Sequence, residues 1–321
     1  MIPKAFLADL EAKPAVLRDL ADRLAGADPW AGPDAAPLAG RRRVVLLGMG
    51  SSAYAAGVVA ARLRAAGADA VAVLASTDLL PAADEDTLVV AVSAGGGSVE
   101  TRAAVDHYRA LGPVVLLTNR PGSDLAARCD VVVPMHAGDE DGGVACRSFQ
   151  HTLLLLLALA ARRGGTVDVA ALARAAADAS EDLLARRDAW LPRLREALLG
   201  PDGTYVVAPA RRLSSAQQGA LMLREGPRRA AAGCETGDWS HVDVYLTKTL
   251  DYRMLLLAGS RWEGELLRWT TERGSTVVAV GADVPDATQV LRYAGDGDDD
   301  VRLVAEVLVP ELLAADAWLN P

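Results

Sequence analysis

The stretch VVAVSAGGGSVET at residues 89–101 decides the fold class. Its first four residues form a short, continuous apolar run, which is typical of a strand buried on both faces of a parallel sheet. The run ends at Ser93, and three glycines follow. Ser98 is then in position to cap a helix that carries Glu100 and Thr101 in its first turn. A strand, a glycine turn and a helix in this order predict one unit of an alternating α/β domain.

The same alternation extends to both sides of this stretch. We expect apolar strands at VVLLGM (44–49), AVAVLAS (70–76), TLVVAVS (87–93), PVVLLTN (113–119) and DVVVPM (130–135). We expect helices at 50–67, 98–111, 123–128 and 147–163. Short apolar strands separated by helices predict a parallel sheet with helices on both faces.

The second half of the chain repeats this order. Strands are expected at TYVVAPA (204–210), RMLLLAG (253–259), STVVAVG (275–281) and VLRYAG (290–295). Helices are expected at 167–199, 214–225, 263–273 and 301–319. Residues 89–118 and 255–281 share the order strand, loop, helix, glycine, strand, which indicates an internal duplication of the fold.

The length of the chain fits two domains. With 321 residues, of which 51% are hydrophobic, the chain exceeds the usual size of one domain and can fill two cores. Apolar residues at helical spacing precede a Pro-, Gly- and Ala-rich linker over 28–40. From the N-terminus, we expect a helical arm and linker (1–40), a first domain (41–165), a linker helix (166–200) and a second domain (201–321).

Composition excludes several classes of protein. A net charge of −9 opposes binding to nucleic acid and to anionic membranes, so an anionic ligand needs local positive potential. The longest apolar run, 153–161, is too short to cross a bilayer, and the N-terminus lacks the pattern of a signal peptide. Cys129, Cys146 and Cys234 show no CxxC spacing. We therefore expect a cytoplasmic protein without a structural metal, a disulfide framework or a cofactor.

Two connections in the first half have the composition of an anion site. Ser51 and Ser52 follow two glycines in GMGSSA (48–53), and SAGGGS (93–98) joins the central strand to its helix. Glycines let the backbone approach an anion closely, and a helix N-terminus contributes partial positive charge. The alternative is that Ser98 only caps its helix and the glycines only form a turn. NAD is not expected, because no acidic residue ends the strand after GMGSSA.

These motifs resemble the sugar isomerase (SIS) domain family. The resemblance rests on strand–GxGSS–helix, then strand–SxxGxSxET–helix, then HAGDEDGGVACRSF (136–149), and it covers nearly the whole chain. It includes the E-x-x-P helix within LADLEAKPAVLRDL (7–20) and the segment GALMLREGPRRAAAGCETGDWSHVD (219–243). The resemblance implies two tandem, doubly wound, flavodoxin-like domains, each with three αβα layers around a parallel sheet.

The resemblance also implies a set of site residues. The ligand is expected to be a phosphorylated sugar or amino sugar, and its contacts are Ser51, Ser52, Ser93, Ala94, Gly95, Ser98, Val144 and Arg147. Glu225 would move a proton between C1 and C2 through an enediol or enolamine, and His241, sixteen residues later, would open the sugar ring. In the family this histidine reaches the active site of a neighbouring subunit, which implies a homodimer with a shared site. Without the resemblance, Glu225 reads as a solvated helix end and His241 as an interface residue.

Departures from the family pattern leave the reaction open. The family's phosphate loop reads S-[QR]-S-G-x-[ST], whereas this chain has Ala94 at the second position and lacks the middle hydroxyl. In the segment that corresponds to V-A-S-T-K, Arg147 replaces a small hydroxyl residue. Arg147 either clamps an anion or lies on the helix surface paired with Asp139 or Glu140. Met222 replaces a lysine one turn before the glutamate.

Alternative functions follow from these departures. The leading prediction is a phosphosugar aldose–ketose isomerase or an amino-sugar-phosphate deaminase. One alternative is a non-catalytic phosphosugar-binding regulatory protein. Another is a deglycase for a sugar–amine phosphate, which Arg147 would favour if it faced a carboxylate on the amine side. Near the histidine, Asp238 is expected to cap a short helix and Lys248 to lie in a solvated loop.

Overall fold

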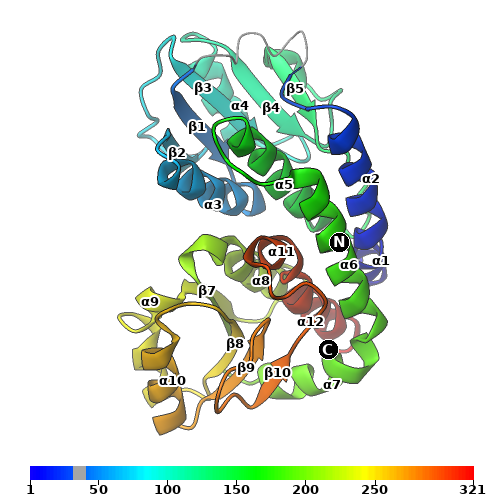
Figure 1. Cartoon of the computed structure of the whole chain (residues 1–321), viewed down its shortest axis with the longest axis vertical. Coiled ribbons are helices and arrows are strands. Elements are labelled where there is room, and N and C mark those ends of the chain that lie inside the picture. The colour runs from blue at the N-terminus through cyan, green and yellow to red at the C-terminus, as the bar shows by residue number, and fades with distance from the viewer. Residues whose placement is uncertain (32–40) are drawn as a thin grey trace. The chain divides into compact units, whose positions relative to one another are not determined.

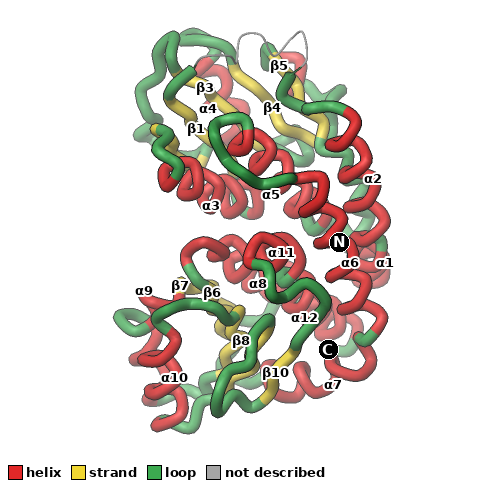
Figure 2. Tube along the Cα trace, in the orientation of Figure 1, coloured by secondary structure: helices red, strands yellow, loops and turns green. Residues whose placement is uncertain are grey.

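The computed structural model describes residues 1–31 and 41–321, so most of the expected linker over 28–40 lies outside the described residues. The chain folds into two compact units, and each contains one five-stranded parallel sheet (Figure 1 and Figure 2). The first-sheet unit comprises Val16–Asp139 and Arg147–Ala173. The second-sheet unit comprises Met1–Ala15, Glu140–Cys146 and Arg174–Pro321. The units are therefore not continuous segments of the chain.

The first sheet has the strand order β2-β1-β3-β4-β5. Its strands are β1 (Arg43–Gly48), β2 (Asp69–Leu74), β3 (Thr87–Val92), β4 (Val114–Thr118) and β5 (Val131–Pro134). The helices of this unit are α3 (Ser51–Ala65), α4 (Val99–Tyr108), the 3₁₀ turn η2 (Ala126–Arg128) and α5 (Arg147–Ala161). Buried side chains of β1, β3 and β4 pack against α4, whereas α3 packs against α5 and β1. This is the predicted sheet with helices on both faces.

The order of the strands creates a switch point between β1 and β3. The chain leaves β1 through α3 to pair β2 on one side, then returns to pair β3 on the other side of β1. In the shared register Leu47 pairs Ala91, so the connections after β1 and β3 begin at the same edge of the sheet. Ligands of doubly wound proteins bind at this edge, where successive connections diverge.

The second sheet repeats this topology with the order β10-β9-β8-β6-β7. Its strands are β6 (Thr204–Ala208), β7 (Ala231–Glu235), β8 (Arg253–Leu257), β9 (Thr276–Val280) and β10 (Gln289–Leu291). Helical elements of the same unit are α1 (Pro3–Glu11), α7 (Arg187–Leu198), η3 (Ala210–Arg212), α8 (Leu213–Glu225), α9 (Thr236–Trp239), η4 (Asp243–Lys248), α10 (Glu263–Glu272), α11 (Asp299–Ala305) and α12 (Leu308–Leu319). Two helices, α2 (Lys13–Gly26) and α6 (Val169–Ala185), run across the division between the units.

The predicted fold class is confirmed, with three corrections at the level of elements. The strand β7 falls in a segment for which no strand was expected. The expected helix over 301–319 is divided into α11 and α12, and the helical stretch over 167–199 is divided into α6 and α7. Among the helices of residues 1–31 and 41–321, none combines the length and the apolar character needed to cross a bilayer.

The N-terminal helices belong to the core of the second-sheet unit. Phe6 is fully buried, and its ring lies 6.1 Å from the ring of Trp318 in α12. The Lys13 ammonium donates to the Glu311 carboxylate of α12, and both side chains are fully buried. Burial raises the pKa of Glu311 to about 7, although Lys13 acts in the opposite direction. The Asp9 carboxylate accepts a hydrogen bond of 2.8 Å from the Gly142 N–H, which fixes the segment Glu140–Cys146 to this unit.

Candidate functional site

The connection from β1 to α3 brings two hydroxyls to the switch point of the first sheet. Gly50 precedes α3 with φ of 50°, and Ser51 and Ser52 are the first helical residues. A Cβ atom on Gly48 would lie 2.8 Å from the Ser52 Cβ, so this close approach of helix and strand requires glycine. Both serines are partly exposed, and their hydroxyls make no hydrogen bond to the part of the chain that the structure describes.

The connection from β3 to α4 lies beside it, because β1 and β3 are neighbours. The buried Ser93 extends the sheet, since its N–H donates to the Leu117 carbonyl at 3.0 Å. Gly96 has φ of 64°, and a Cβ atom there would meet the Ser123 hydroxyl at 2.4 Å. The Ala94 carbonyl accepts from the Asn119 N–H at 3.1 Å, while Gly95 is exposed to solvent. Backbone hydrogen bonds thus hold the turn in place, and Gly95 leaves one side of it open to solvent.

Ser98 acts as the N-cap of α4. Its hydroxyl accepts from the Thr101 N–H at 3.1 Å and donates to the Glu100 carboxylate at 2.9 Å. The pKa of Glu100 is lowered by its own backbone N–H and by this hydroxyl. The capping interpretation of Ser98 therefore holds in this structure. Ser51, Ser52 and Ser93 are the remaining hydroxyls that the sequence placed at this edge.

Asn119 at the end of β4 supports the same edge and was not expected from the sequence. Its side-chain amide donates to the Gly138 carbonyl at 2.6 Å, and its carbonyl oxygen accepts from the Ala137 N–H at 2.9 Å. These two bonds hold the chain that leads from β5 toward α5. A signal was present in the sequence, since Asn119 is the polar residue that ends the apolar run PVVLLTN (113–119).

Arg147 is buried, so the interpretation of an arginine on the helix surface is wrong. The side chain is 7% exposed, and its guanidinium donates to the backbone carbonyl of Asp139. The Asp139 carboxylate instead pairs with Arg120 at 2.7 Å. The Glu140 carboxylate accepts from the Cys146 N–H at 2.7 Å. Arg147 begins α5 in the first-sheet unit and lies close to Gly138.

Val144 belongs to the other unit. It lies within Glu140–Cys146, and its side chain is 2% exposed. This segment is tied to α8, because the Gln218 amide donates to the Ala145 carbonyl at 2.7 Å. The same amide lies 3.5 Å from the Met222 sulfur, which is fully buried. Met222 is therefore a core residue of the second-sheet unit.

Glu225 is the last residue of α8 and is partly buried. Burial raises the pKa of its carboxyl group, and no opposing charge offsets this effect. Within residues 1–31 and 41–321 the carboxylate makes no hydrogen bond or ion pair. A half-buried carboxylate without a partner is uncommon at a helix end, where such groups are usually solvated. Enzymes use this arrangement to tune the pKa of an acid–base group.

His241 is exposed in the turn between α9 and η4. Its N–H donates to the Asp238 carbonyl at 2.9 Å. The sequence predicted that Asp238 caps a short helix, but Asp238 does not cap α9. Glu235 does so, since its carboxylate accepts from the N–H groups of Gly237 and Asp238 at 2.7 and 2.9 Å. Lys248 is exposed, as expected, but it ends the 3₁₀ helix η4 and lies 5.4 Å from the Tyr245 ring.

The structure distributes the predicted site residues between the two units. Ser51, Ser52 and the turn 93–98 meet at one edge of the first sheet, and Arg147 belongs to the same unit. Val144, Glu225 and His241 belong to the second-sheet unit. This arrangement defines a class of protein: doubly wound parallel domains with serine- and glycine-rich connections at the switch point.

The comparison with known families agrees with that class. Residues 37–162 match the SIS domain family. The chain is 29% identical over 257 residues to the isomerizing glutamine–fructose-6-phosphate aminotransferase of Mycobacterium leprae. That match covers 75% of the chain and 39% of the relative, so the chain spans about two fifths of the relative's length.

Solved structures share the fold over nearly the whole chain. The C-terminal domain of glucosamine-fructose-6-phosphate aminotransferase from Francisella tularensis has a TM-score of 0.83 at 17% identity, covering 98% of this chain and 96% of that one. Tagatose-6-phosphate ketose/aldose isomerase from Escherichia coli has a TM-score of 0.81 at 18% identity, covering 98% and 92%. At these identities the likeness establishes the fold.

Proposed function

We propose that this protein is a phosphosugar aldose–ketose isomerase or an amino-sugar-phosphate deaminase that works by proton transfer without a cofactor. The observation that carries the proposal is the state of Glu225, a half-buried carboxylate with a raised pKa and no partner among the described residues. The match of residues 37–162 to the SIS domain family supports the choice of a phosphosugar as ligand.

Glu225 is assigned the transfer of the proton. Isomerisation removes a proton from C2 and delivers it to C1 through an enediol, and deamination passes through the corresponding enolamine. A carboxylate whose pKa lies nearer to neutrality is a stronger base than an exposed one and holds the proton more readily between the two steps. Burial provides this change at Glu225.

The phosphate group is assigned to the two connections of the first sheet. Ser51 and Ser52 have free hydroxyls at the first turn of α3, a helix of 15 residues whose N-terminus carries partial positive charge. The turn 93–98 adds backbone N–H groups at the adjacent strand end. In a chain with a net charge of −9, such a local site is needed to hold an anion.

His241 is assigned the opening of the sugar ring. Its exposure supports a role at a site completed by a second copy of the chain, because a side chain delivered to a neighbouring subunit must project from its own surface. The proposal therefore includes a homodimer. Sedimentation of the protein at micromolar concentration tests this part, and a monomer would contradict it.

The test of the reaction is proton exchange. Wild-type protein is incubated in D2O with a panel of hexose 6-phosphates and amino-hexose 6-phosphates, and deuterium at C1 and C2 is followed by NMR. We expect exchange with at least one sugar, and we expect Glu225→Gln to slow it by about 100-fold or more. Glu272→Gln is the matched control, because Glu272 also ends a helix but is exposed. Equal rates for the two variants would overturn the role of Glu225.

A non-catalytic phosphosugar-binding protein is the second candidate. Two observations favour it: the Ser98 hydroxyl is engaged in capping α4, and Met222 is a buried core residue one turn before Glu225. Thermal denaturation separates the candidates. Stabilisation by a sugar phosphate with no exchange would support the binding protein, since a ligand stabilises the folded state whether or not it reacts. The deglycase is a third candidate, which Arg147 would favour if it faced a carboxylate on the amine side of the substrate.

A further inference from the structure

The second sheet has its own switch point, and arginines lie at it. The strand β6 pairs β7 on one side and β8 on the other, with Val207 beside Leu256 in the register. The connection after β6 contains Arg211 and Arg212 in η3, and the connection after β8 begins with Ala258 and Gly259. By topology this edge is the counterpart of the serine- and glycine-rich edge of the first sheet.

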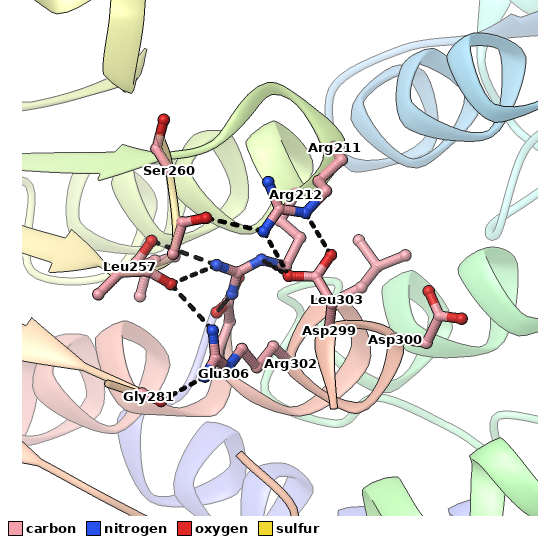
Figure 3. Close-up of polar contacts among 12 residues, drawn as sticks. Arg211, Arg212, Leu257, Ser260, Gly281, Asp299, Asp300, Arg302, Leu303 and Glu306 are labelled. Carbon is pink, nitrogen blue, oxygen red and sulfur yellow. Dashed lines mark hydrogen bonds and ion pairs between the residues drawn. The ribbon is translucent and has the colours of Figure 1, made fainter. Parts of the chain in front are cut away.

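A carboxylate occupies this edge (Figure 3). Arg211 brackets the Asp299 carboxylate with Nε and Nη2, at 2.5 and 2.8 Å. Arg212 approaches the same carboxylate, with Nε at 3.2 Å. Figure 3 shows Asp300, the next residue of α11, directed away from both arginines. Two guanidinium groups thus converge on one carboxylate, and Arg211 holds it with the two-point geometry that arginine also uses for phosphate.

A third arginine adds positive charge to the cluster. Arg302 donates to the carbonyls of Gly281 and Ala258 at 2.6 and 3.3 Å, and it makes no ion pair with the described part of the chain. Gly259 makes room for the group: its φ is 125°, and a Cβ atom there would lie 2.8 Å from Arg302 Nη1 and 3.0 Å from Arg212 Nη2. Three guanidinium groups therefore crowd around one glycine.

The inner and outer parts of this cluster differ in exposure. Arg212 and Glu306 form a pair in which both side chains are fully buried. The Arg211 and Asp299 side chains are 47% and 33% exposed. Asp299 is the first residue of α11, so its carboxylate lies at the end of the helix and not in the core. The inner pair is a fixed part of the fold, and the outer carboxylate is accessible to exchange.

We propose that this edge is a second anion-binding site, suited to a phosphate monoester, and that Asp299 occupies it as an internal ligand when no anion is bound. A phosphate dianion has more charge and more acceptor oxygens than the carboxylate it displaces. The anion contacts Arg211 and Arg212 rather than the backbone. The N–H groups of Gly259 and Ser260 already donate to the Glu263 carboxylate, at 2.5 and 2.7 Å.

This site is separate from the residue assigned to catalysis. Arg212 directly precedes α8, and Glu225 is the last of its 13 residues. At the rise of an α-helix, the two ends of α8 lie about 20 Å apart. Loss of the second anion site and loss of proton exchange are therefore independent results.

The test measures binding of inorganic phosphate by calorimetry at fixed ionic strength. Every variant carries Gly95→Asp, which places a negative charge in the exposed turn of the first sheet, where a Cβ atom has open space. In this background we expect Asp299→Asn to tighten phosphate binding by about tenfold or more, because it removes the carboxylate that Arg211 holds at two points and that Arg212 approaches through Nε. The matched control is Asp300→Asn, which removes the same charge from the same helical turn and should change binding by less than about twofold.

Two results complete the test. Adding Arg211→Gln to the Asp299→Asn protein should abolish the gain in affinity. Equal effects of Asp299→Asn and Asp300→Asn, or no effect of either, would overturn the proposal.

If Asp299→Asn fails to fold, chemical modification of the wild-type protein by phenylglyoxal tests the site instead. Phosphate should slow modification of Arg211 by about threefold or more relative to Arg268, which is 57% exposed. Equal protection of the two arginines would reject the site.

Discussion

At the scale of single residues, burial determines what Glu225 can do. Two glutamates end helices in comparable positions, Glu225 in α8 and Glu272 in α10. Glu272 is exposed, whereas Glu225 is partly buried with no charged or hydrogen-bonding partner among the described residues. Removing water from a carboxylate disfavours the ionised form and raises its pKa. The difference between the two residues is a difference in hydration.

The pH dependence of proton exchange should report this shift. Because the proposal assigns Glu225 the role of a base in its ionised form, it requires the rate to rise as pH increases through the raised pKa of this group. The rising limb should therefore lie above the ordinary pKa of glutamate, 4.5. Initial rates are measured at saturating substrate, so that ionisation of the free sugar phosphate does not contribute. A rising limb that survives in Glu225→Gln would assign it to another group.

Substitution of Ser98 separates its two possible roles. Ser98→Ala removes the acceptor for the Thr101 N–H and should lower the free energy of unfolding by about 1 kcal/mol. Ser98→Asp keeps a capping acceptor, so stability should be retained, while the added charge repels an anion from the turn 93–98. Urea denaturation and phosphate binding measured on both variants check this. Full phosphate affinity in Ser98→Asp would place the anion elsewhere.

Predictions for single residues failed where the role of a side chain depends on its hydrogen-bond partner. The sequence identified Arg147 as a candidate site residue. It could not show that the guanidinium donates to the backbone carbonyl of Asp139, because no side-chain pattern reveals such a bond. Asp238 was preferred as a helix cap because aspartate is common there. The structure uses Glu235 instead, whose longer side chain reaches back to the N–H groups of Gly237 and Asp238.

At the scale of elements, strands were predictable when both of their faces were buried. The strands β3 and β4 are buried along their full length and read as continuous apolar runs. The strand β7, with sequence AAGCE, lies at the edge of the second sheet and has no fully buried residue. The strand β7 is held at the edge by backbone pairing with β6, and such pairing produces no distinct side-chain pattern in the sequence.

The ion pair between Lys13 and Glu311 links the N-terminal helices to α12 and should be costly to break. Lys13→Met leaves a fully buried carboxylate without its partner and should lower the free energy of unfolding by about 3–5 kcal/mol. The double variant Lys13→Met/Glu311→Leu should recover most of this loss, because two apolar side chains replace two buried charges. Chemical denaturation measures both variants.

The pH dependence of the Lys13→Met variant provides the control. The folded-state pKa of Glu311 is about 7 in the intact pair, above its ordinary value of 4.5. A raised pKa means that stability present below pH 4.5 is lost as pH rises through 7. Without Lys13 the carboxylate loses its stabilising charge, so the deficit of the variant should grow with pH. A deficit that is constant across this range would exclude ionisation of Glu311 as its cause.

At the scale of the whole molecule, the two units draw on interleaved parts of the chain. The second-sheet unit contains Met1–Ala15 and Glu140–Cys146 in addition to its C-terminal half. The internal duplication was visible in the order of strands and glycines. This interleaving was not, because it depends on pairings between distant residues such as Asp9 with Gly142 and Lys13 with Glu311.

Deletion of residues 1–15 should therefore weaken the second-sheet unit. The deletion removes Phe6 from the face of Trp318 and leaves Glu311 without Lys13. We expect amide protons of β6 and β8 to exchange with solvent faster in the deleted protein, while those of β1 and β3 keep their protection. Hydrogen exchange read by mass spectrometry measures both sheets in the same sample. Faster exchange confined to the first sheet would contradict the assignment of this segment.

The interleaved chain also constrains how this protein can be recombined with its relatives. A chimera joined at a single crossover between the two sheets would keep Met1–Ala15 and Glu140–Cys146 from one parent and the body of the second-sheet unit from the other. Every such hybrid would mismatch Lys13 against a foreign residue at position 311. An exchange of the complete second-sheet unit therefore requires all three of its segments to come from the same parent.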